Sequence, residues 1–175
     1  MSERDANAPD GIADEHAGPS SGLRRHASPL SLLVFATVVI LGLSGLLGRE
    51  RTWRAEANGT ALEIHASEII RNGEFFEMRV TVSAADPIDE LRIEVDASLW
   101  EDMTVNTMIP AATEEGSADG VFAFTFAEVP AGQAFDMKAD LQVNPDIFGS
   151  NPGTVRVLDG DEQLVELPIE IRVLP

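Results

Sequence analysis

The sequence predicts an all-β domain, an antiparallel two-sheet sandwich of seven to eight strands, behind one N-terminal transmembrane helix. Three features of the 175-residue chain indicate this architecture. An uncharged apolar run lies near the N-terminus. From Thr60 onward, apolar residues recur at every second position, which is the period of a strand with one buried face. Cysteine is absent, so a domain of roughly 115 residues must rely on an apolar core, and it is long enough to bury one.

The N-terminal part of the chain divides into a tail and a membrane span. Residues 1–28 are rich in alanine, glycine, serine, proline and acids, so we expect a disordered tail. The run Leu30–Leu47 contains no charge, side-chain amide or proline. As a helix it would extend about 27 Å, close to the hydrocarbon thickness of a bilayer. Residues 29–47 are therefore predicted to form a transmembrane signal-anchor, followed by a linker at 48–58 and the sandwich at 59–175.

The basic residues on the two sides of this span nearly balance. Arg24 and Arg25 precede it, and Arg49, Arg51 and Arg54 follow it, so charge alone does not orient the helix. A single β-domain behind one N-terminal span is typical of a signal-anchor with its tail inside. We therefore expect a single-pass protein of the cell membrane whose C-terminal domain is extracytoplasmic, in the periplasm or outside the cell.

A cleaved signal peptide is the alternative interpretation of the same run. Leu30–Leu41 has the length of an h-region, and Gly42 and Ser44 offer small residues at a spacing that suits cleavage. Two features favour the anchor instead. The n-region would be unusually long at about 28 residues, and apolar residues continue to Leu47.

Three glycines at the end of the run predict a second role for the helix. Gly42, Gly45 and Gly48 recur at every third position, and small residues let helix backbones approach closely in lipid. They are candidate contacts with another membrane protein. The alternative is that glycine is simply common in membrane helices.

Strand patterns separated by turn residues predict the structure of the rest of the chain. Apolar and polar residues alternate through 62–67, 76–82, 91–97, 122–126, 135–143 and 155–173. Turn signals are Asn72-Gly73, Asp86-Pro87, Glu115-Gly116, Pro130–Gly132 and Asn151–Gly153. Asp159-Gly160 predicts a hairpin inside the last run. Pro168 interrupts that run, which suits an edge strand or a bulge.

This pattern resembles the broad immunoglobulin-like or fibronectin type III-like class over residues 59–175. The resemblance is one of architecture. The disulfide cysteines of immunoglobulin domains are absent, and with no tyrosine in the chain there is no tyrosine corner. Trp100, which follows the third predicted strand, is the candidate for the core tryptophan. So broad a class implies a fold and no particular function.

The net charge of −18 lies entirely in the C-terminal domain. Up to Arg54, six arginines balance six acids, so the excess of acids falls beyond that residue. Such a surface repels nucleic-acid phosphates, which argues against nucleic-acid binding. The simplest explanation of the negative charge is that it keeps the domain soluble, and the alternative is that it binds a basic partner.

No catalytic residue, cofactor site or metal site is predicted. The domain has a single histidine, His65, on the polar face of the first strand, and no motif of a hydrolase, nucleotide-binding or metalloprotease site is present. Acidic clusters at Asp159–Glu162, at Glu101-Asp102 and at Asp136 with Asp140 leave calcium binding as an alternative, although none has EF-hand spacing.

The sequence therefore favours a non-catalytic accessory or assembly subunit of an envelope membrane complex. We expect Leu30–Leu47 to lie in the membrane. We expect another membrane or envelope protein to bind the loops at one end of the sandwich. These loops are Trp100–Met103, Pro110–Gly120 and Asn144–Gly153, with Trp100, Ile109, Ile147 and Phe148 as apolar anchors. The alternatives are a ligand- or calcium-binding extracytoplasmic module and, third, a hydrolase.

Overall fold

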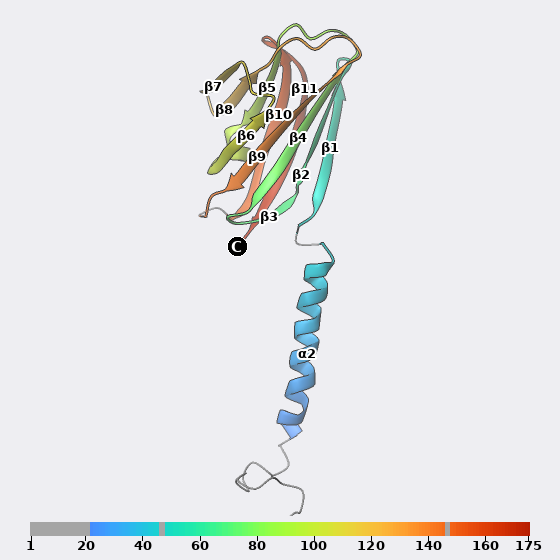
Figure 1. Cartoon of the computed structure of the whole chain (residues 1–175), viewed down its shortest axis with the longest axis vertical. Coiled ribbons are helices and arrows are strands. Elements are labelled where there is room, and N and C mark those ends of the chain that lie inside the picture. The colour runs from blue at the N-terminus through green and yellow to red at the C-terminus, as the bar shows by residue number, and fades with distance from the viewer. Residues whose placement is uncertain (1–21, 46–47, 146–147) are drawn as a thin grey trace, which may run out of the picture. The chain divides into compact units, whose positions relative to one another are not determined.

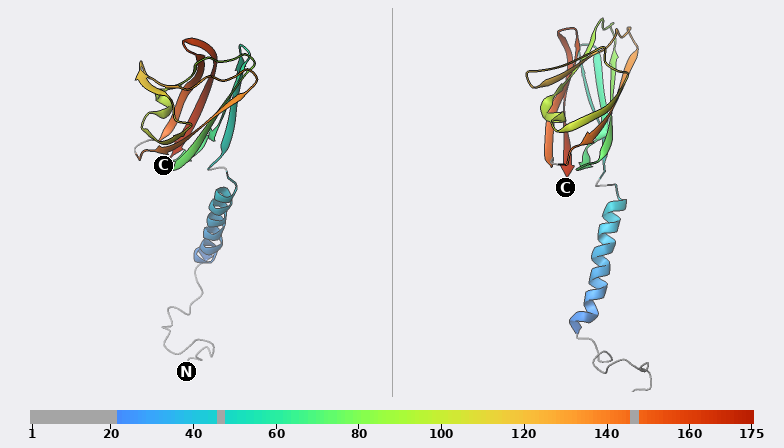
Figure 2. Two further views of the ribbon diagram at one scale, coloured as in Figure 1. Left: turned by 45° about the horizontal axis from the view of Figure 1, so that its top comes forward. Right: turned by 60° about the vertical axis from the view of Figure 1, so that its left-hand side comes forward.

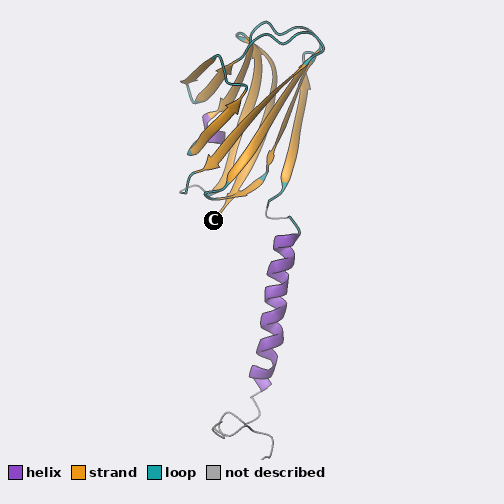
Figure 3. Ribbon diagram, viewed as in Figure 1, coloured by secondary structure: helices purple, strands orange, loops and turns teal. Residues whose placement is uncertain are grey.

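A computed structural model describes residues 22–45, 48–145 and 148–175. The chain divides into two compact units, Met1–Ser44 and Gly45–Pro175. The described residues of the first unit form helix α2 (Gly22–Leu43), shown in purple in Figure 3. The described residues of the second unit form the strands and a short helix, α3 (Ala97–Trp100).

Helix α2 begins earlier and ends earlier than the predicted span. It starts at Gly22, inside the segment predicted as the tail, and its described large apolar side chains are exposed, Phe35 by 68%. It ends at Leu43, after which Gly45 adopts a φ of 70°. Among the described residues, no helix combines the length and the apolar character that crossing a membrane requires. Residues 46 and 47 of the predicted span lie outside the described part of the chain.

The second unit is a two-sheet sandwich, as predicted, and its named strand pairs are antiparallel except for β3 and β11, which run parallel (Figures 1 and 2). In the five-stranded sheet the order is β1-β2-β4-β9-β6, and in the six-stranded sheet it is β3-β11-β10-β5-β8-β7. The strands are β1 (Glu50–Ala57), β2 (Thr60–Ser67), β3 (Ile69–Arg71), β4 (Phe75–Ala84), β5 (Leu91–Asp96), β6 (Met103–Ile109), β7 (Glu114–Ala118), β8 (Val121–Thr125), β9 (Ala134–Val143), β10 (Gly149–Asp159) and β11 (Glu162–Leu174). The prediction of seven to eight strands was too low, because several short edge strands were not recognised.

The core forms where the predicted alternation is strongest. In β2, β4 and β5 every second side chain is buried between the sheets, with Ile64 and Ile93 at 0% exposure and Val80 at 1%. Full burial of one such side chain stabilises the fold by roughly 1.5–3 kcal/mol. The polar positions face out, and His65 is half-exposed beside Thr52 and Glu50, as predicted for the outer face. Alternation therefore identified the residues of these three strands that hold the sheets together.

The predicted linker at residues 48–58 is wrong, because most of it forms strand β1. This strand pairs along its whole length with β2, and Trp53 is buried opposite Ile64. The pattern is weak in sequence because Trp53 is the single large apolar side chain among alternating charges. Burial of one tryptophan is enough to bring β1 into the sheet.

Two of the predicted turns lie inside strands. Glu115-Gly116 belongs to β7, and Asn151–Gly153 belongs to β10. Gly153 has a packing role, because a Cβ built there would lie 2.6 Å from the Cβ of Leu99 in α3. The glycine thus lets the helix lie against the strand and does not reverse the chain.

The remaining turn signals agree with the structure. Gly73 and Gly160 have φ values of 76° and 56°, which suit glycine in tight turns. Pro168 lies on β11 where one side of the strand is locally unpaired, since β3 pairs only with Arg172–Leu174. Strand β11 is not the last strand of its sheet, but Pro168 lies where β3 does not reach, so its missing N–H costs no pairing on that side.

Candidate functional site

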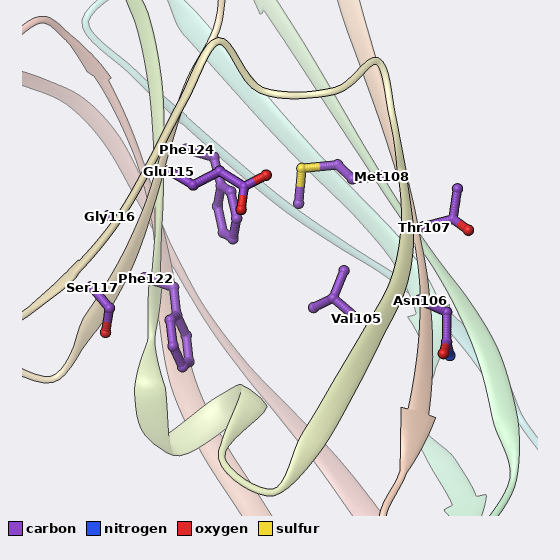
Figure 4. A pocket seen from close by; sticks show the side chains of 9 residues that line it. All are labelled: Val105, Asn106, Thr107, Met108, Glu115, Gly116, Ser117, Phe122 and Phe124. Carbon is purple, nitrogen blue, oxygen red and sulfur yellow. The ribbon is translucent and has the colours of Figure 1, made fainter.

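An open groove lies between two sheet edges on one side of the sandwich. Strand β6 ends the five-stranded sheet, and β7 ends the six-stranded sheet. The groove between them has a volume of about 540 Å³, and we call it the β6–β7 groove. Its lining consists of Val105, Asn106, Thr107, Met108, Glu115, Gly116, Ser117, Phe122 and Phe124 (Figure 4). This size falls within the range of about 300–1,000 Å³ that is usual for binding pockets.

The floor of the groove is an aromatic cluster. Phe122 and Phe124 project from β8, and the ring of Trp100 in α3 lies 6.5 Å and 5.7 Å from theirs between centroids. Trp100 is 3% exposed and Phe124 is 8% exposed, so the cluster is continuous with the core. Tilted ring pairs at these distances add to the stability gained by burial. The floor is therefore preformed.

The opposite wall is supplied by β6. Figure 4 shows the side chains of Val105 and Met108 pointing across the gap toward the phenylalanines, while Thr107 points away. Val105 is 39% exposed, which is high for a valine in a sandwich. The groove thus offers apolar surface on two walls without being closed.

Strand β6 is unusual among the edges of this sandwich. Its sequence, Met-Thr-Val-Asn-Thr-Met-Ile, has no charge, and most of it is exposed. The opposite edge of the same sheet, β1, carries four charged side chains among its eight residues. Edge strands are normally protected by charges, because their free N–H and C=O groups would otherwise pair with another chain. The protection on β6 is a register shift between Val105 and Thr107.

The segment that lines the groove is acidic, although Lys138 of β9 lies opposite Ile109 of β6. From Ala97 to Gln133 the chain has no lysine, arginine or histidine and six acids. Figure 4 shows the carboxylate of Glu115, on β7, directed toward the gap. The apolar floor therefore lies beside the Glu115 carboxylate, in a segment of net negative charge that we call the acidic segment.

The position of α3 beneath the floor is set by polar contacts with β10. The Asp96 carboxylate, directly before α3, accepts hydrogen bonds from the Thr154 N–H at 2.8 Å and from Nη1 of Arg156 at 2.7 Å. Partial burial raises the pKa of Asp96, but the hydrogen bonds from Arg156 and Thr154 outweigh it, so the pKa lies below its usual value. The Ser98 hydroxyl also donates to the Pro152 carbonyl at 2.8 Å. These contacts hold the helix that carries Trp100.

The predicted apolar anchors do not form one surface. Trp100 is buried, so its alternative assignment as a core tryptophan is the correct one. Ile109 is 59% exposed at the end of β6 opposite Lys138, whereas Phe148 is 68% exposed in the loop that follows Val143. Val143 pairs with the first residue of β6, so the two side chains lie at opposite ends of a strand that spans roughly 20 Å. Ile147 lies outside the described residues.

The three glycines predicted to pack against another helix do not lie together on one helix face. Gly42 lies within α2, while Gly45 and Gly48 follow the end of the helix at Leu43. Because two of the three are not helical, they do not share one face of α2. The described surroundings of all three are open, with no atom within 4 Å of a Cβ built there.

The acidic clusters considered for calcium are placed on separate surface elements. Asp159 is the last residue of β10, and its Oδ1 accepts a hydrogen bond from the Glu90 N–H at 2.9 Å. Asp136 accepts one from the Thr81 hydroxyl at 2.6 Å. Over the described ranges, no three or more histidine, cysteine or acidic side chains are grouped closely enough to hold a metal ion.

Sequence reasoning missed the groove itself. Val105, Met108, Phe122 and Phe124 were not predicted as a site, although Phe122 and Phe124 belonged to a predicted strand. A signal was present in the uncharged run of β6 within a long segment free of basic residues. That signal acquires meaning only once β6 is known to be an edge strand.

No family model matches the chain, and no curated protein matches it. The similar solved structures include CaCohA2 from Clostridium acetobutylicum, at 19% identity over 59% of this chain and 83% of that one, with a TM-score of 0.43. The chitin-binding domain of a chitinase from Pyrococcus furiosus is 14% identical over 65% and 100% of the chains, with a TM-score of 0.41. A non-cellulosomal cohesin from Archaeoglobus fulgidus is 9% identical over 73% and 92%, also with a TM-score of 0.41. The resemblance to the broad immunoglobulin-like class is thus architectural and names no family.

Proposed function

We propose that this protein is a non-catalytic binding module that is anchored in a membrane and holds a protein partner in the β6–β7 groove. Its role would be that of an accessory or assembly subunit of an envelope membrane complex. The observation that carries the proposal is the combination of an uncharged, exposed edge strand with an apolar groove directly beside it. Surfaces of this kind on a soluble domain are typical of interaction sites.

The membrane anchor is proposed from the N-terminal unit. The run that begins at Leu30 has no charged or amide side chain, and the described large apolar side chains of α2 are exposed around the helix. Exposed apolar surface is typical of membrane or protein interaction sites, which supports this proposal. We therefore place the run Leu30–Leu47 in the cell membrane and the sandwich on the extracytoplasmic side.

The lining of the groove favours binding over catalysis. Its single titratable side chain is Glu115. Hydrolysis of a glycosidic bond requires two carboxyl groups that face each other, and nucleophilic catalysis requires a nucleophile beside a base. The groove offers neither arrangement, whereas an aromatic floor suits apolar side chains of a partner.

The test is recovery of the partner from membranes with the full-length protein in a mild detergent. Val105→Trp fills the groove from an exposed position and should abolish recovery of the partner. Thr104→Trp is the matched control, because it adds the same bulk to the same strand on the opposite face. Both variants should fold, since both sites are exposed. Equal recovery with the two variants would show that the groove is not the interface.

A further inference from the structure

We infer that the occupant of the β6–β7 groove is an extended segment of the partner, which adds to the five-stranded sheet as a strand beside β6. Its alternate side chains would be apolar and enter the groove, and the side chains between them would be lysine or arginine. This inference rests on the proposed function and specifies the chemistry of the partner at the same site.

The backbone of β6 supports this mode of binding. As the last strand of its sheet, β6 is paired on one side only, with β9. An extended peptide gains affinity by pairing with such free N–H and C=O groups. The competing edges are less suitable, because β1 carries four charges and β7 has five residues, including two glutamates and a glycine. The register shift at Asn106 limits continuous pairing to a few residues on either side of it.

The side chains of the groove explain why apolar and polar residues should alternate in the added strand. Successive side chains of a strand point to opposite faces, so every second residue of a strand beside β6 would face the space between the sheets. That space is lined by Val105, Met108, Phe122 and Phe124, and it has room for apolar side chains. The intervening residues would face outward into solvent, on the side of β6 to which Thr107 points (Figure 4).

The net charge of the acidic segment selects the chemistry of those outward residues. Six acids and no basic residue lie between Ala97 and Gln133, the segment that supplies both walls and the floor. Lysine or arginine in the added strand would be attracted to the acidic segment, and acidic residues would be repelled. A second copy of this chain, with a net charge of −18, is disfavoured on the same ground.

The test uses the full-length protein in a mild non-ionic detergent and a fluorescently labelled peptide of alternating valine and lysine. The peptide has seven residues, the length of β6. We expect saturable binding that weakens as salt rises from about 50 mM to about 200 mM, because ionic attraction to the acidic segment is screened. A peptide of alternating valine and glutamate should bind at least about tenfold more weakly, a difference of about 1.4 kcal/mol. Val105→Trp should abolish binding, and Thr104→Trp should retain it.

Backbone methylation separates strand addition from simple ionic attraction. Two further peptides carry N-methyl groups on alternate residues, one set in each phase. Only one phase directs its N–H groups toward β6, so only one peptide should lose binding. In parallel, hydrogen exchange should slow at the amides of β6 and remain unchanged at those of β1 when the valine–lysine peptide is bound. Equal binding of the two methylated peptides, or protection outside β6, would refute strand addition.

The remaining outcomes distinguish failure of this inference from failure of the proposed function. If the peptides fail to bind while Val105→Trp still abolishes partner recovery, the groove is the interface but its occupant is not a basic strand. If neither peptide binding nor partner recovery responds to Val105→Trp, the proposed function is wrong as well. If the protein alone is a dimer whose β6 amides are already protected, the occupant is a second copy, and the inference of a basic partner is wrong.

Discussion

Replacing Gly153 with alanine should destabilise the sandwich through one specific contact. A Cβ at this position would lie 2.6 Å from the Cβ of Leu99 and 3.2 Å from its backbone nitrogen, whereas ordinary contacts are 3.4–4 Å. Leu99 is fully buried, and α3 is tied to β10 through Asp96, so the helix has little freedom to retreat. Overpacking of this kind costs about 1–3 kcal/mol.

The net effect follows from comparing the folded and unfolded chains. Gly→Ala restricts the unfolded chain, which favours folding by about 0.4–1 kcal/mol where the backbone conformation permits alanine. For Gly153→Ala we therefore expect a net loss of about 1–2 kcal/mol, since the steric cost exceeds this gain. With a urea m-value of about 2 kcal/mol/M, the midpoint should fall by about 0.5–1 M.

Gly116→Ala is the matched control for this measurement. Gly116 also lies in a strand without a positive φ, but no atom lies within 4 Å of a Cβ built there. This variant should be as stable as the wild type or more stable by about 0.4–1 kcal/mol. Urea unfolding of the full-length protein in mild detergent, followed by tryptophan fluorescence, compares the two. If Gly153→Ala is as stable as Gly116→Ala, the packing of α3 on β10 described above is incorrect.

Three further predictions concern the same domain. Asp96→Asn should destabilise the protein by about 1.5–3 kcal/mol at pH 7, the usual contribution of a charged hydrogen bond. Because the pKa of Asp96 is lowered on folding, this contribution is present above the unfolded pKa and disappears as pH falls through the folded pKa, so wild type and variant should converge in acid denaturation. Residues 48–175 should fold alone, with a melting temperature that EDTA does not change. Residues 59–175 should be less stable by about 3–5 kcal/mol, because Trp53 and β1 are removed. Equal melting temperatures of the two fragments would contradict the assignment of β1 to the core sheet. Protease added to intact cells should remove the sandwich and spare the N-terminus, and the reverse pattern would overturn the proposed orientation.

Strands with a regular two-residue period could be predicted because their signal is local. In β2, β4, β5 and β9 the apolar residues recur at every second position, and burial follows the same period. The hairpin turn at Asp159-Gly160 was equally local, since a glycine with positive φ has a steric cause within the turn itself.

Other elements depended on contacts between distant residues. Strand β1 has one buried large side chain, Trp53, and it joins the sheet because β2 offers it a partner. Gly153 has the composition of a turn but lies in a strand, because Leu99 approaches it from α3. In both cases the decisive neighbour lies elsewhere in the chain.

The sequence by itself determined that this chain carries an apolar N-terminal run and an acidic, cysteine-free domain of alternating strands with an apolar core. These properties depend on composition and on spacing of a few residues. Only the tertiary structure decided that β6 and β7 end their sheets and that Val105, Met108, Phe122 and Phe124 border one groove. Strand order is set by pairing between segments far apart in the chain, and no local pattern marks which strand is left without a partner.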